Sequence, residues 1–241
     1  MYTQKVDYQD DSTVLQAYVA YEEKDLIKPR HNSPVVLIAH AWCGRDSFVE
    51  EKARSLAKLG YIGCAIDVYG KGVLGDCPET NRTLMQPLME DRKMLLRRLI
   101  AGLEVAKKIE MANNNKIAAI GYCFGGLCVL DLARSGADLR GVVSFHGLLQ
   151  ASRAILAKNM RAKVLALHGY EDPMVPPDVM LEFAKEMTDA KAEWQLHIFG
   201  KTMHAFTDPK ANNSNMGTVY SLRADKYSWT EAVQFLEEVF K

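Results

Sequence analysis

The sequence predicts an α/β fold with a mostly parallel central sheet, helices on both faces and an antiparallel N-terminal edge hairpin. The first observation behind this class is that short, continuous apolar runs alternate with helical patterns along the chain. The second is that residues 5–8 and 14–19 alternate between apolar and polar side chains, as half-exposed antiparallel strands do. No repeat or linker-like stretch interrupts the 241 residues. We therefore expect a single domain over residues 1–241.

After the hairpin, the first half of the chain alternates strands and helices. Buried strands are expected at residues 35–39 and 61–68. Ser47 and Glu50 have the spacing of a capping box and predict a helix start between these strands, and Gly60 suits the left-handed residue that ends the helix. After a glycine-rich loop, Pro87 suits the first turn of one long helix that reaches about residue 110.

The second half continues the alternation. Strands are expected at residues 117–120, 141–145, 164–167 and 194–199, and helices are expected to begin near Phe124, Ala151, Pro177 and Ser228. Ser228 and Glu231 again have capping-box spacing. Residues 201–221 have little apolar periodicity and predict a long loop.

Composition excludes several classes of function. The 30 basic and 30 acidic side chains balance, which argues against nucleic acid as a partner. No apolar stretch approaches the length of a membrane span, so we expect a cytoplasmic protein without a membrane partner. The five cysteines lack CxxC or Cys/His ligand spacing, which predicts reduced thiols and no metal site.

The most informative stretch surrounds Cys123, where the predicted strand 117–120 turns into a helix. In a nucleophile elbow the residues two before and two after the nucleophile must be small, and Gly121 and Gly125 meet that requirement. The same pattern also fits a glycine-rich turn that carries a buried, inert Cys. Other segments of the sequence must distinguish a nucleophilic Cys123 from an inert one.

Two later segments carry the groups that a nucleophile needs. The strand 164–167 leads into a loop with Glu171 and Asp172, and Asp172 is favoured as the orienting carboxylate because Pro173 fixes the backbone after it. His204 lies in the loop after the last strand. The order Cys123, Asp172, His204 is the nucleophile, acid and base order of α/β hydrolases.

The other histidines fit catalysis less well. His31 lies in a polar turn and His197 within a strand, while His146 and His168 end strands, where a structural role is the expectation. His40 is intermediate, because it leads into the loop that would supply half of an oxyanion hole.

Together these residues resemble the dienelactone hydrolase family, a cysteine-nucleophile branch of the α/β hydrolases. The resemblance covers nearly the whole chain, and its motifs are 121–126, 67–69, 168–169 and 204–206. It implies Cys123 as nucleophile, His204 as base and Asp172 as its partner, with the backbone N–H groups of Trp42 and Phe124 as oxyanion donors. It also implies hydrolysis of a small carboxylic ester or lactone through a thiol acyl-enzyme, with no metal or organic cofactor.

The sequence departs from the namesake pattern at two positions. Ala41 stands where the namesake has a Glu that interacts with the thiol, and Asp208 stands where it has a carboxylate-binding Arg. We therefore expect a persistent Cys123 thiolate and a preference for uncharged substrates. The remaining substrate-binding candidates are Arg82, Tyr69, Tyr122 and His146.

Two alternatives stay open at this stage. One is a thiol redox or sulfur-transfer protein, which Cys43 in the predicted oxyanion loop would serve as a second thiol. The other is a non-catalytic, ligand-binding relative, although such relatives normally lose a triad residue. For the assembly we expect a monomer or a weak homodimer.

Overall fold

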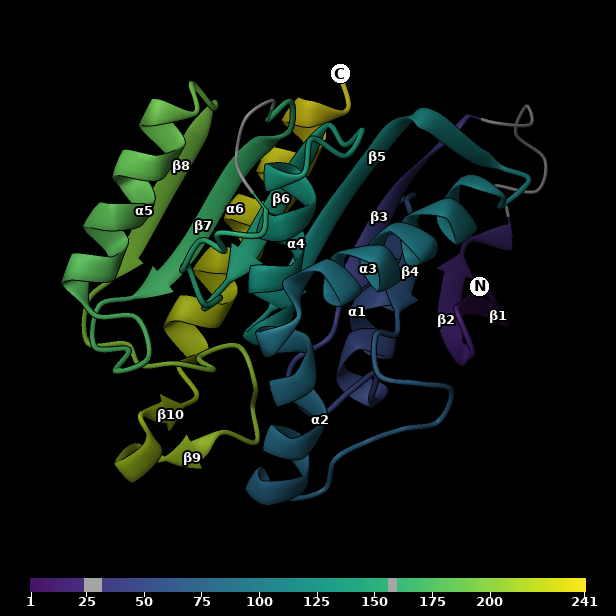
Figure 1. Ribbon diagram of the computed structural model, residues 1–241. Helices are drawn as coiled ribbons and strands as arrows, with labels where there is room; N and C mark the ends of the chain where they lie inside the picture. Colours follow the sequence, from purple (N-terminus) through teal and green to yellow (C-terminus); the bar gives the residue numbers. More distant parts are fainter. Residues whose placement is uncertain (24–31, 156–159) are drawn as a thin grey trace. The chain divides into compact units, whose positions relative to one another are not determined.

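The computed structural model describes residues 1–23, 32–155 and 160–241. Its contacts divide the chain into two compact units, residues 1–119 and 120–241, and each unit is described by itself. In Figure 1 the first unit runs from purple to teal and the second from teal to yellow. The expected single-domain organisation stays a prediction.

The first unit is built on four strands in the order β1-β2-β4-β3. Their bounds are β1 Tyr2–Asp10, β2 Thr13–Tyr21, β3 Ser33–Ala39 and β4 Ile62–Ile66. β1 pairs antiparallel with β2, β2 pairs antiparallel with β4, and β3 pairs parallel with β4. The predicted N-terminal edge hairpin is confirmed, and it is the purple pair of strands in Figure 1.

Helices α1 (Ser47–Lys58) and α3 (Arg92–Lys107) cover opposite faces of β4. A side chain at Gly63 would meet Ala53 of α1, whereas Ile66 packs against Gly102 of α3. Because successive residues of a strand point to opposite faces, positions 63 and 66 face opposite sides. The predicted α/β layering is therefore present in this unit.

Helix boundaries in the first unit differ from three predictions. The Asp46 carboxylate, and not Ser47, caps α1 by accepting from the amides of Phe48 and Val49. The predicted long helix is two helices, α2 (Pro78–Glu90) and α3, with Pro87 inside α2. Asp91 separates them, because its backbone leaves the helical region and its side chain accepts from the Met94 amide to start α3.

Strand β5 (Ala112–Tyr122) runs from the first unit into the second. The second unit then adds the parallel strands β6 (Gly141–Phe145), β7 (Lys163–Gly169) and β8 (Trp194–Phe199). Its helices are α4 (Phe124–Arg134), α5 (Pro177–Asp189) and α6 (Leu222–Val239).

Helices also lie on both faces of β6. Ser144 faces Gly126 of α4, while a side chain at Gly141 would meet Phe235 of α6. Positions 141 and 144 are three apart and point to opposite sides. Both units thus have the α/β layering that the sequence predicts, and the parallel pairing includes β3 with β4 in the first unit and β6, β7 and β8 in the second.

Two helix predictions in the second unit are wrong. Helix α6 begins at Leu222, where the Ser221 hydroxyl accepts from the Ala224 amide, so Ser228 lies inside the helix. No helix starts at Ala151, because Ser152 and Ile155 form an isolated bridge around a turn. The rest of that expected helix includes residues 156–159, which lie outside the described residues, as does His31.

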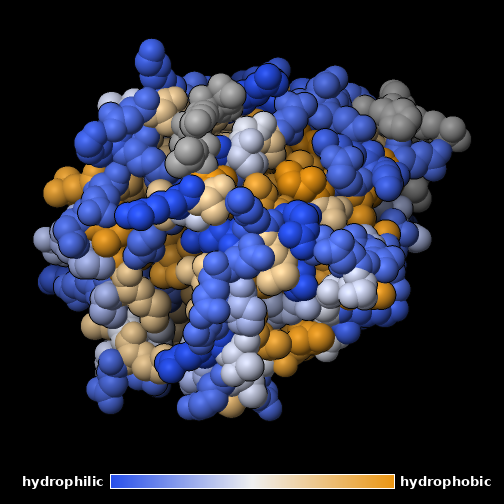
Figure 2. Space-filling view, viewed as in Figure 1, coloured by the Kyte–Doolittle hydropathy of each residue, from blue (hydrophilic) through white to orange (hydrophobic). Residues whose placement is uncertain are grey.

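The long loop predicted over 201–221 is confirmed. It contains only the short pair β9 (Asn212–Asn213) and β10 (Thr218–Val219), with a 3₁₀ turn at Ser214–Met216 between them. Among the described helices, none combines the length and apolarity needed to cross a membrane. The face in Figure 2 mixes hydrophilic and hydrophobic residues over its whole extent.

Candidate active site

Cys123 lies on a strained turn between β5 and α4. Its backbone has φ 55° and ψ −117°, a conformation that residues other than glycine rarely adopt. A side chain at Gly121 would come within 2.0 Å of the Gly125 carbonyl oxygen, so the turn closes only with glycine there. This is the backbone geometry of a nucleophile elbow.

Hydrogen bonds fix the strained residue at the start of α4. The Cys123 amide donates to the Phe145 carbonyl at 3.0 Å, and its carbonyl accepts from the Gly126 amide at 2.9 Å. Cys123 is the N-cap residue, and Phe124 is the first residue of the helix. The N-terminus of a helix favours negative charge, which stabilises a thiolate or an oxyanion at this point.

Asp172 is held by the turn that follows β7. Its amide donates to the Gly169 carbonyl at 3.2 Å, and its Oδ1 atom accepts from the Met174 amide at 2.9 Å. The side chain is completely buried. One carboxylate oxygen is thus used to fix the turn, and the other remains for a partner.

That partner is His204. The His204 Nδ1 atom and the Asp172 Oδ2 atom are 2.7 Å apart, and both side chains are buried. The backbone of His204 is held as well, since its amide donates to the Gly217 carbonyl and its carbonyl accepts from the Val219 amide. A proton on Nδ1 is fixed by the carboxylate, which leaves Nε2 as the nitrogen that can exchange protons.

The loop that holds His204 packs against the loop that holds Asp172. Gly217 has φ 67°, and a side chain there would come within 2.2 Å of the Pro173 ring. Sequence reasoning missed this glycine, although a Gly between polar residues is an ordinary signal for a left-handed turn. The absence of a side chain at position 217 lets the two loops approach each other.

Electrostatics separates His204 from an ordinary buried histidine. Burial by itself favours the neutral ring, but the charge of the Cys123 thiolate and the hydrogen bond to Asp172 outweigh it and raise the pKa of His204 to about 10. Nε2 is buried and makes no well-aligned hydrogen bond among the described residues. Catalytic hydrogen bonds are often loose in a free enzyme and tighten with substrate.

The structure thus brings Cys123, Asp172 and His204 into one electrostatic unit. Phe124 lies where the sequence places an oxyanion donor, in the first turn of α4. Tyr122 and His146 are buried, Tyr122 stacking on Phe145 at 4.6 Å between ring centroids. Their expected contact with substrate stays a prediction.

His168, expected to be structural, has that kind of contact. Its Nε2 atom lies 3.1 Å from the Val175 carbonyl oxygen, which ties the end of β7 to the loop after Asp172. Burial lowers the pKa of His168, so the ring stays neutral. We place it outside the catalytic residues.

Asp208 is half-buried and caps a turn. Its Oδ1 atom accepts from the Lys210 amide at 2.9 Å, and its own amide donates to the Ala205 carbonyl at 3.0 Å. A local backbone role therefore explains the position of this carboxylate. Its effect on anionic substrates stays a prediction.

Three predicted site residues belong to the first unit, so their roles relative to Cys123 also stay predictions. The Tyr69 hydroxyl donates to the Trp42 carbonyl at 2.9 Å, which fixes the backbone of the predicted oxyanion loop. The Tyr69 hydroxyl is therefore used in a hydrogen bond to that loop. Arg82 is exposed on α2, which starts at Pro78, so it lies in a helix although the sequence predicts the helix to start only near Pro87.

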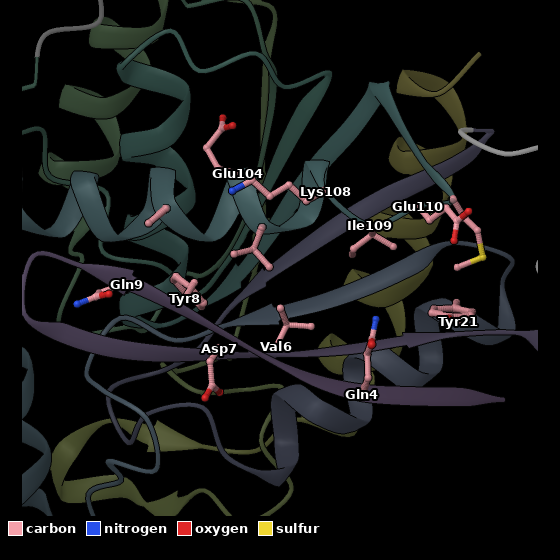
Figure 3. A pocket seen from close by; sticks show the side chains of 13 residues that line it. Gln4, Val6, Asp7, Tyr8, Gln9, Tyr21, Glu104, Lys108, Ile109 and Glu110 are labelled. Carbon is pink, nitrogen blue, oxygen red and sulfur yellow. The ribbon is translucent and has the colours of Figure 1, made fainter.

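The first unit also has a surface hollow of about 860 Å³ between β1 and α3. Figure 3 shows Gln4, Val6 and Tyr8 of β1 lining it, with Glu104 of α3 and Lys108 just after that helix. No residue of the Cys123 site lines this hollow. Within the described residues, no cluster of three or more His, Cys, Asp or Glu side chains could hold a metal ion.

Comparisons with known proteins find relatives that match most of the chain. A putative carboxymethylenebutenolidase of Aquifex aeolicus is 26% identical over 243 residues, which is 99% of each chain. An uncharacterised protein of Caenorhabditis elegans is 36% identical over 146 residues, which is 59% of this chain and 92% of its own. A solved structure titled as a dienelactone hydrolase-like promiscuous phosphotriesterase from metagenomic libraries is 33% identical, with a TM-score of 0.93 and coverage of 100% and 99%.

The family model gives the assignment. It is described as the dienelactone hydrolase family and matches residues 15–240, which includes Cys123, Asp172 and His204. The chain therefore belongs to the dienelactone hydrolase family, and it is a hydrolase with an α/β fold.

Proposed function

We propose that the chain hydrolyses carboxylic esters or lactones through a Cys123–His204–Asp172 triad and a thiol acyl-enzyme. The observation that carries this proposal is the 2.7 Å contact that fixes His204 to Asp172, in a ring whose raised pKa reflects the Cys123 thiolate. A thiolate beside an imidazolium is the reactive form of a catalytic cysteine.

In the acylation step the Cys123 sulfur attacks the carbonyl carbon of the substrate. The new C–S bond pushes the carbonyl electron pair onto oxygen and forms a tetrahedral intermediate. When it collapses, the C–O bond to the leaving alcohol breaks, and the His204 imidazolium donates its Nε2 proton to the departing oxygen. The acyl group is then a thioester on Cys123, and His204 is neutral.

In the deacylation step neutral His204 takes a proton from water through Nε2. The resulting hydroxide attacks the thioester, and the collapse of the second intermediate releases a carboxylic acid and restores the thiolate. Asp172 holds the Nδ1 proton throughout and stabilises the imidazolium each time it forms. With a lactone, the alcohol stays tethered to the acyl group, and the product is a hydroxy acid.

Charge that develops on the carbonyl oxygen is stabilised by the N-terminus of α4. The Phe124 amide is the first N–H group of the helix and lies at its positive end. We assign Phe124 as one oxyanion donor and keep Trp42 as the second. Removal of one such donor typically costs about 3 kcal/mol of transition-state stabilisation.

The substrate class is a small, uncharged ester or lactone. Asp208 is acidic where the namesake pattern has a carboxylate-binding Arg, and a fixed negative charge beside the acyl pocket would repel an anionic substrate. Neutral phosphotriesters are a second candidate class, because the 33%-identical solved structure is titled a promiscuous phosphotriesterase. In that reaction the same thiolate would attack phosphorus, the P–O bond to one alcohol would break, and that alcohol would leave with the Nε2 proton of His204.

The test is turnover of p-nitrophenyl acetate and a neutral lactone by reduced wild-type protein and by Cys123→Ala. We expect turnover only with Cys123 present, and mass spectrometry should find the trapped acyl group on that residue. Cys128→Ala is the matched control, since Cys128 is a buried thiol in α4. Turnover by Cys123→Ala at the wild-type rate would exclude the mechanism.

The same experiment tests the two alternatives. A thiol redox protein would not turn over the ester in its reduced form, and a non-catalytic relative would bind the lactone without hydrolysing it. A neutral phosphotriester in the substrate panel tests the second substrate class.

A further inference from the structure

Beyond the triad, we propose that His146 and Thr207 form a positioning pair that holds the His204 ring in its catalytic orientation. This inference rests on the proposed function, because it assigns the pair to the same site. Neither residue needs to touch the reacting atoms.

His146 occupies an unusual place at the end of β6. Its backbone has φ 37°, a left-handed conformation that costs free energy for a side chain of this size. Its amide donates to the Leu167 carbonyl at 2.8 Å, and only 2% of the residue is exposed. A hydrogen bond to strand β7 therefore holds the strained backbone of His146. Because the residue is buried, its ring must pack against other parts of the protein.

Those contacts are with the loop that carries His204. The His146 ring lies edge-on to the His204 ring, with centroids 5.1 Å apart and an angle of 65° between the planes. It also lies edge-on to Phe206 at 5.0 Å. Its Nε2 atom is 2.8 Å from the hydroxyl of Thr207, which is 2% exposed.

The contacts of His146 add a restraint on the His204 ring that the hydrogen bond to Asp172 does not supply. The single 2.7 Å contact at Nδ1 fixes one edge of the His204 ring but permits the ring to tilt about that bond. The T-shaped contact between the His146 and His204 rings limits the tilt, while the hydrogen bond to Thr207 keeps His146 in place. A stable tilt keeps Nε2 directed toward Cys123.

Burial argues against the alternative role of His146 in substrate binding. The residue is almost fully covered, and Thr207 already engages its Nε2 atom. A substrate contact would affect KM, whereas a tilted His204 would slow proton transfer and lower kcat. The two roles therefore predict different kinetics.

The experiment compares Thr207→Val with Thr207→Ser in p-nitrophenyl acetate turnover. Valine keeps the shape of threonine and removes the hydroxyl, while serine keeps the hydroxyl. We expect Thr207→Val to lower kcat by about tenfold with KM changed less than about twofold, since misplacement of a catalytic group by 1 Å can cost a hundredfold. Thr207→Ser should keep a kcat close to wild type.

Thr202→Val is the matched control. Thr202 is buried in the same loop, but its hydroxyl donates to the Gly200 carbonyl and not to a histidine. We expect its kcat to stay close to wild type. An equal loss of kcat in Thr202→Val and Thr207→Val would overturn the pair, because any buried hydroxyl of the loop would then have the same effect.

A second variant keeps the test valid if Thr207→Val does not fold. Asparagine tolerates positive φ, so His146→Asn should keep the backbone while it removes the ring. We expect His146→Asn to lower kcat. In the His146→Asn background, Thr207→Ser and Thr207→Val should have the same kcat, because the histidine that the hydroxyl contacts is gone.

The outcomes separate this inference from the proposed function. Wild-type kcat in Thr207→Val, an increase in KM alone, or equal losses in the serine and valine variants would each overturn the positioning pair. Turnover by Cys123→Ala would instead overturn the proposed function. An inactive Cys123→Ala together with a normal Thr207→Val would leave the triad standing and reject the pair.

Discussion

His40 in the first unit and His204 in the second are equally buried, each about 1% exposed, yet their pKa values move in opposite directions. Burial lowers the pKa of His40, whereas the pKa of His204 is raised to about 10 against the same burial. Each ring is held by hydrogen bonds and follows a strand. The difference between the two pKa values must therefore come from the groups that surround each ring.

Two hydrogen bonds join the His40 ring to backbone groups, and the charges of Asp67 and Asp46 raise its pKa less than burial lowers it. Its Nδ1 atom is 2.6 Å from the Ala41 carbonyl oxygen, and its Nε2 atom accepts from the Val68 amide at 3.3 Å. A donor at one nitrogen and an acceptor at the other define the neutral ring. His204 instead faces the Asp172 carboxylate and the Cys123 thiolate, which favour the imidazolium.

This comparison shows which features separate the proposed catalytic histidine from a structural one. Burial and a position after a strand are common to both, so neither feature identifies the site. A carboxylate hydrogen-bonded to the ring does distinguish His204, because it stabilises the charge that a general acid or base gains. His168, with a backbone carbonyl as its partner, behaves as His40 does.

The largest effect is expected from removal of the thiolate. Cys123→Ala should lower kcat/KM for p-nitrophenyl acetate by more than about a thousandfold, because no other nucleophile lies on the elbow. Far-ultraviolet circular dichroism should show that the fold is retained. A loss of less than tenfold would mean that the ionised partner of His204 is not the nucleophile.

The carboxylate partner should have the next largest effect. Asp172→Asn keeps the size of the side chain but removes its charge, so the His204 imidazolium loses stabilisation and the tautomer is no longer fixed. We expect kcat to fall by about 10²- to 10⁴-fold, the usual contribution of general acid–base catalysis. Wild-type kcat in this variant would show that Asp172 does not act on His204 during turnover.

Separation of the two loops should have a smaller effect. In Gly217→Ala the new side chain would meet Pro173 and adopt an unfavourable φ, so the loops of His204 and Asp172 must move apart. We expect a loss of about 1–3 kcal/mol in the free energy of unfolding, measured in urea, together with a lower kcat.

Gly60→Ala is the control for backbone strain alone, since Gly60 has φ 91° and nothing within 4 Å of the added atom. It should lose stability with little effect on kcat. If both variants lose kcat equally, the contact between Gly217 and Pro173 does not position the histidine.

The smallest expected effect is the pH dependence that His40 contributes to stability. Because the folded state lowers the pKa of His40, the unfolded chain binds more protons below about pH 6.5. His40 therefore contributes stability that is present above this pH and is lost as the pH falls. Urea unfolding should show a smaller loss between neutral pH and about pH 5 in His40→Gln than in wild type. An equal loss would place the acid sensitivity elsewhere.

The sequence predicts the turn at Cys123 better than it predicts helix boundaries, and the reason is the range of the interactions. The elbow depends on small residues two positions from Cys123, which any reader of the sequence can see. A helix start depends on competition between neighbouring polar residues, such as Asp46 and Ser47, and on backbone breaks such as the one at Asp91. Local patterns leave that competition undecided.

Contacts between distant residues were also beyond sequence reasoning. Thr207 meets His146, 61 positions earlier in the chain, and Gly217 meets Pro173 across two loops. No periodicity or motif relates such residues, because only the tertiary structure brings them together. The family resemblance implies Cys123, Asp172 and His204 as a triad but implies neither of these two contacts.

The most direct test of the central claim is the titration of His204, followed by two-dimensional ¹H–¹⁵N spectra of the imidazole nitrogens. In wild-type protein we predict that His204 stays protonated at neutral pH and titrates near 10, while in Cys123→Ala its pKa falls because the largest stabilising charge is gone. Titration of wild-type His204 at or below 6.5, as expected of His40, would contradict the claim that a Cys123 thiolate is its partner.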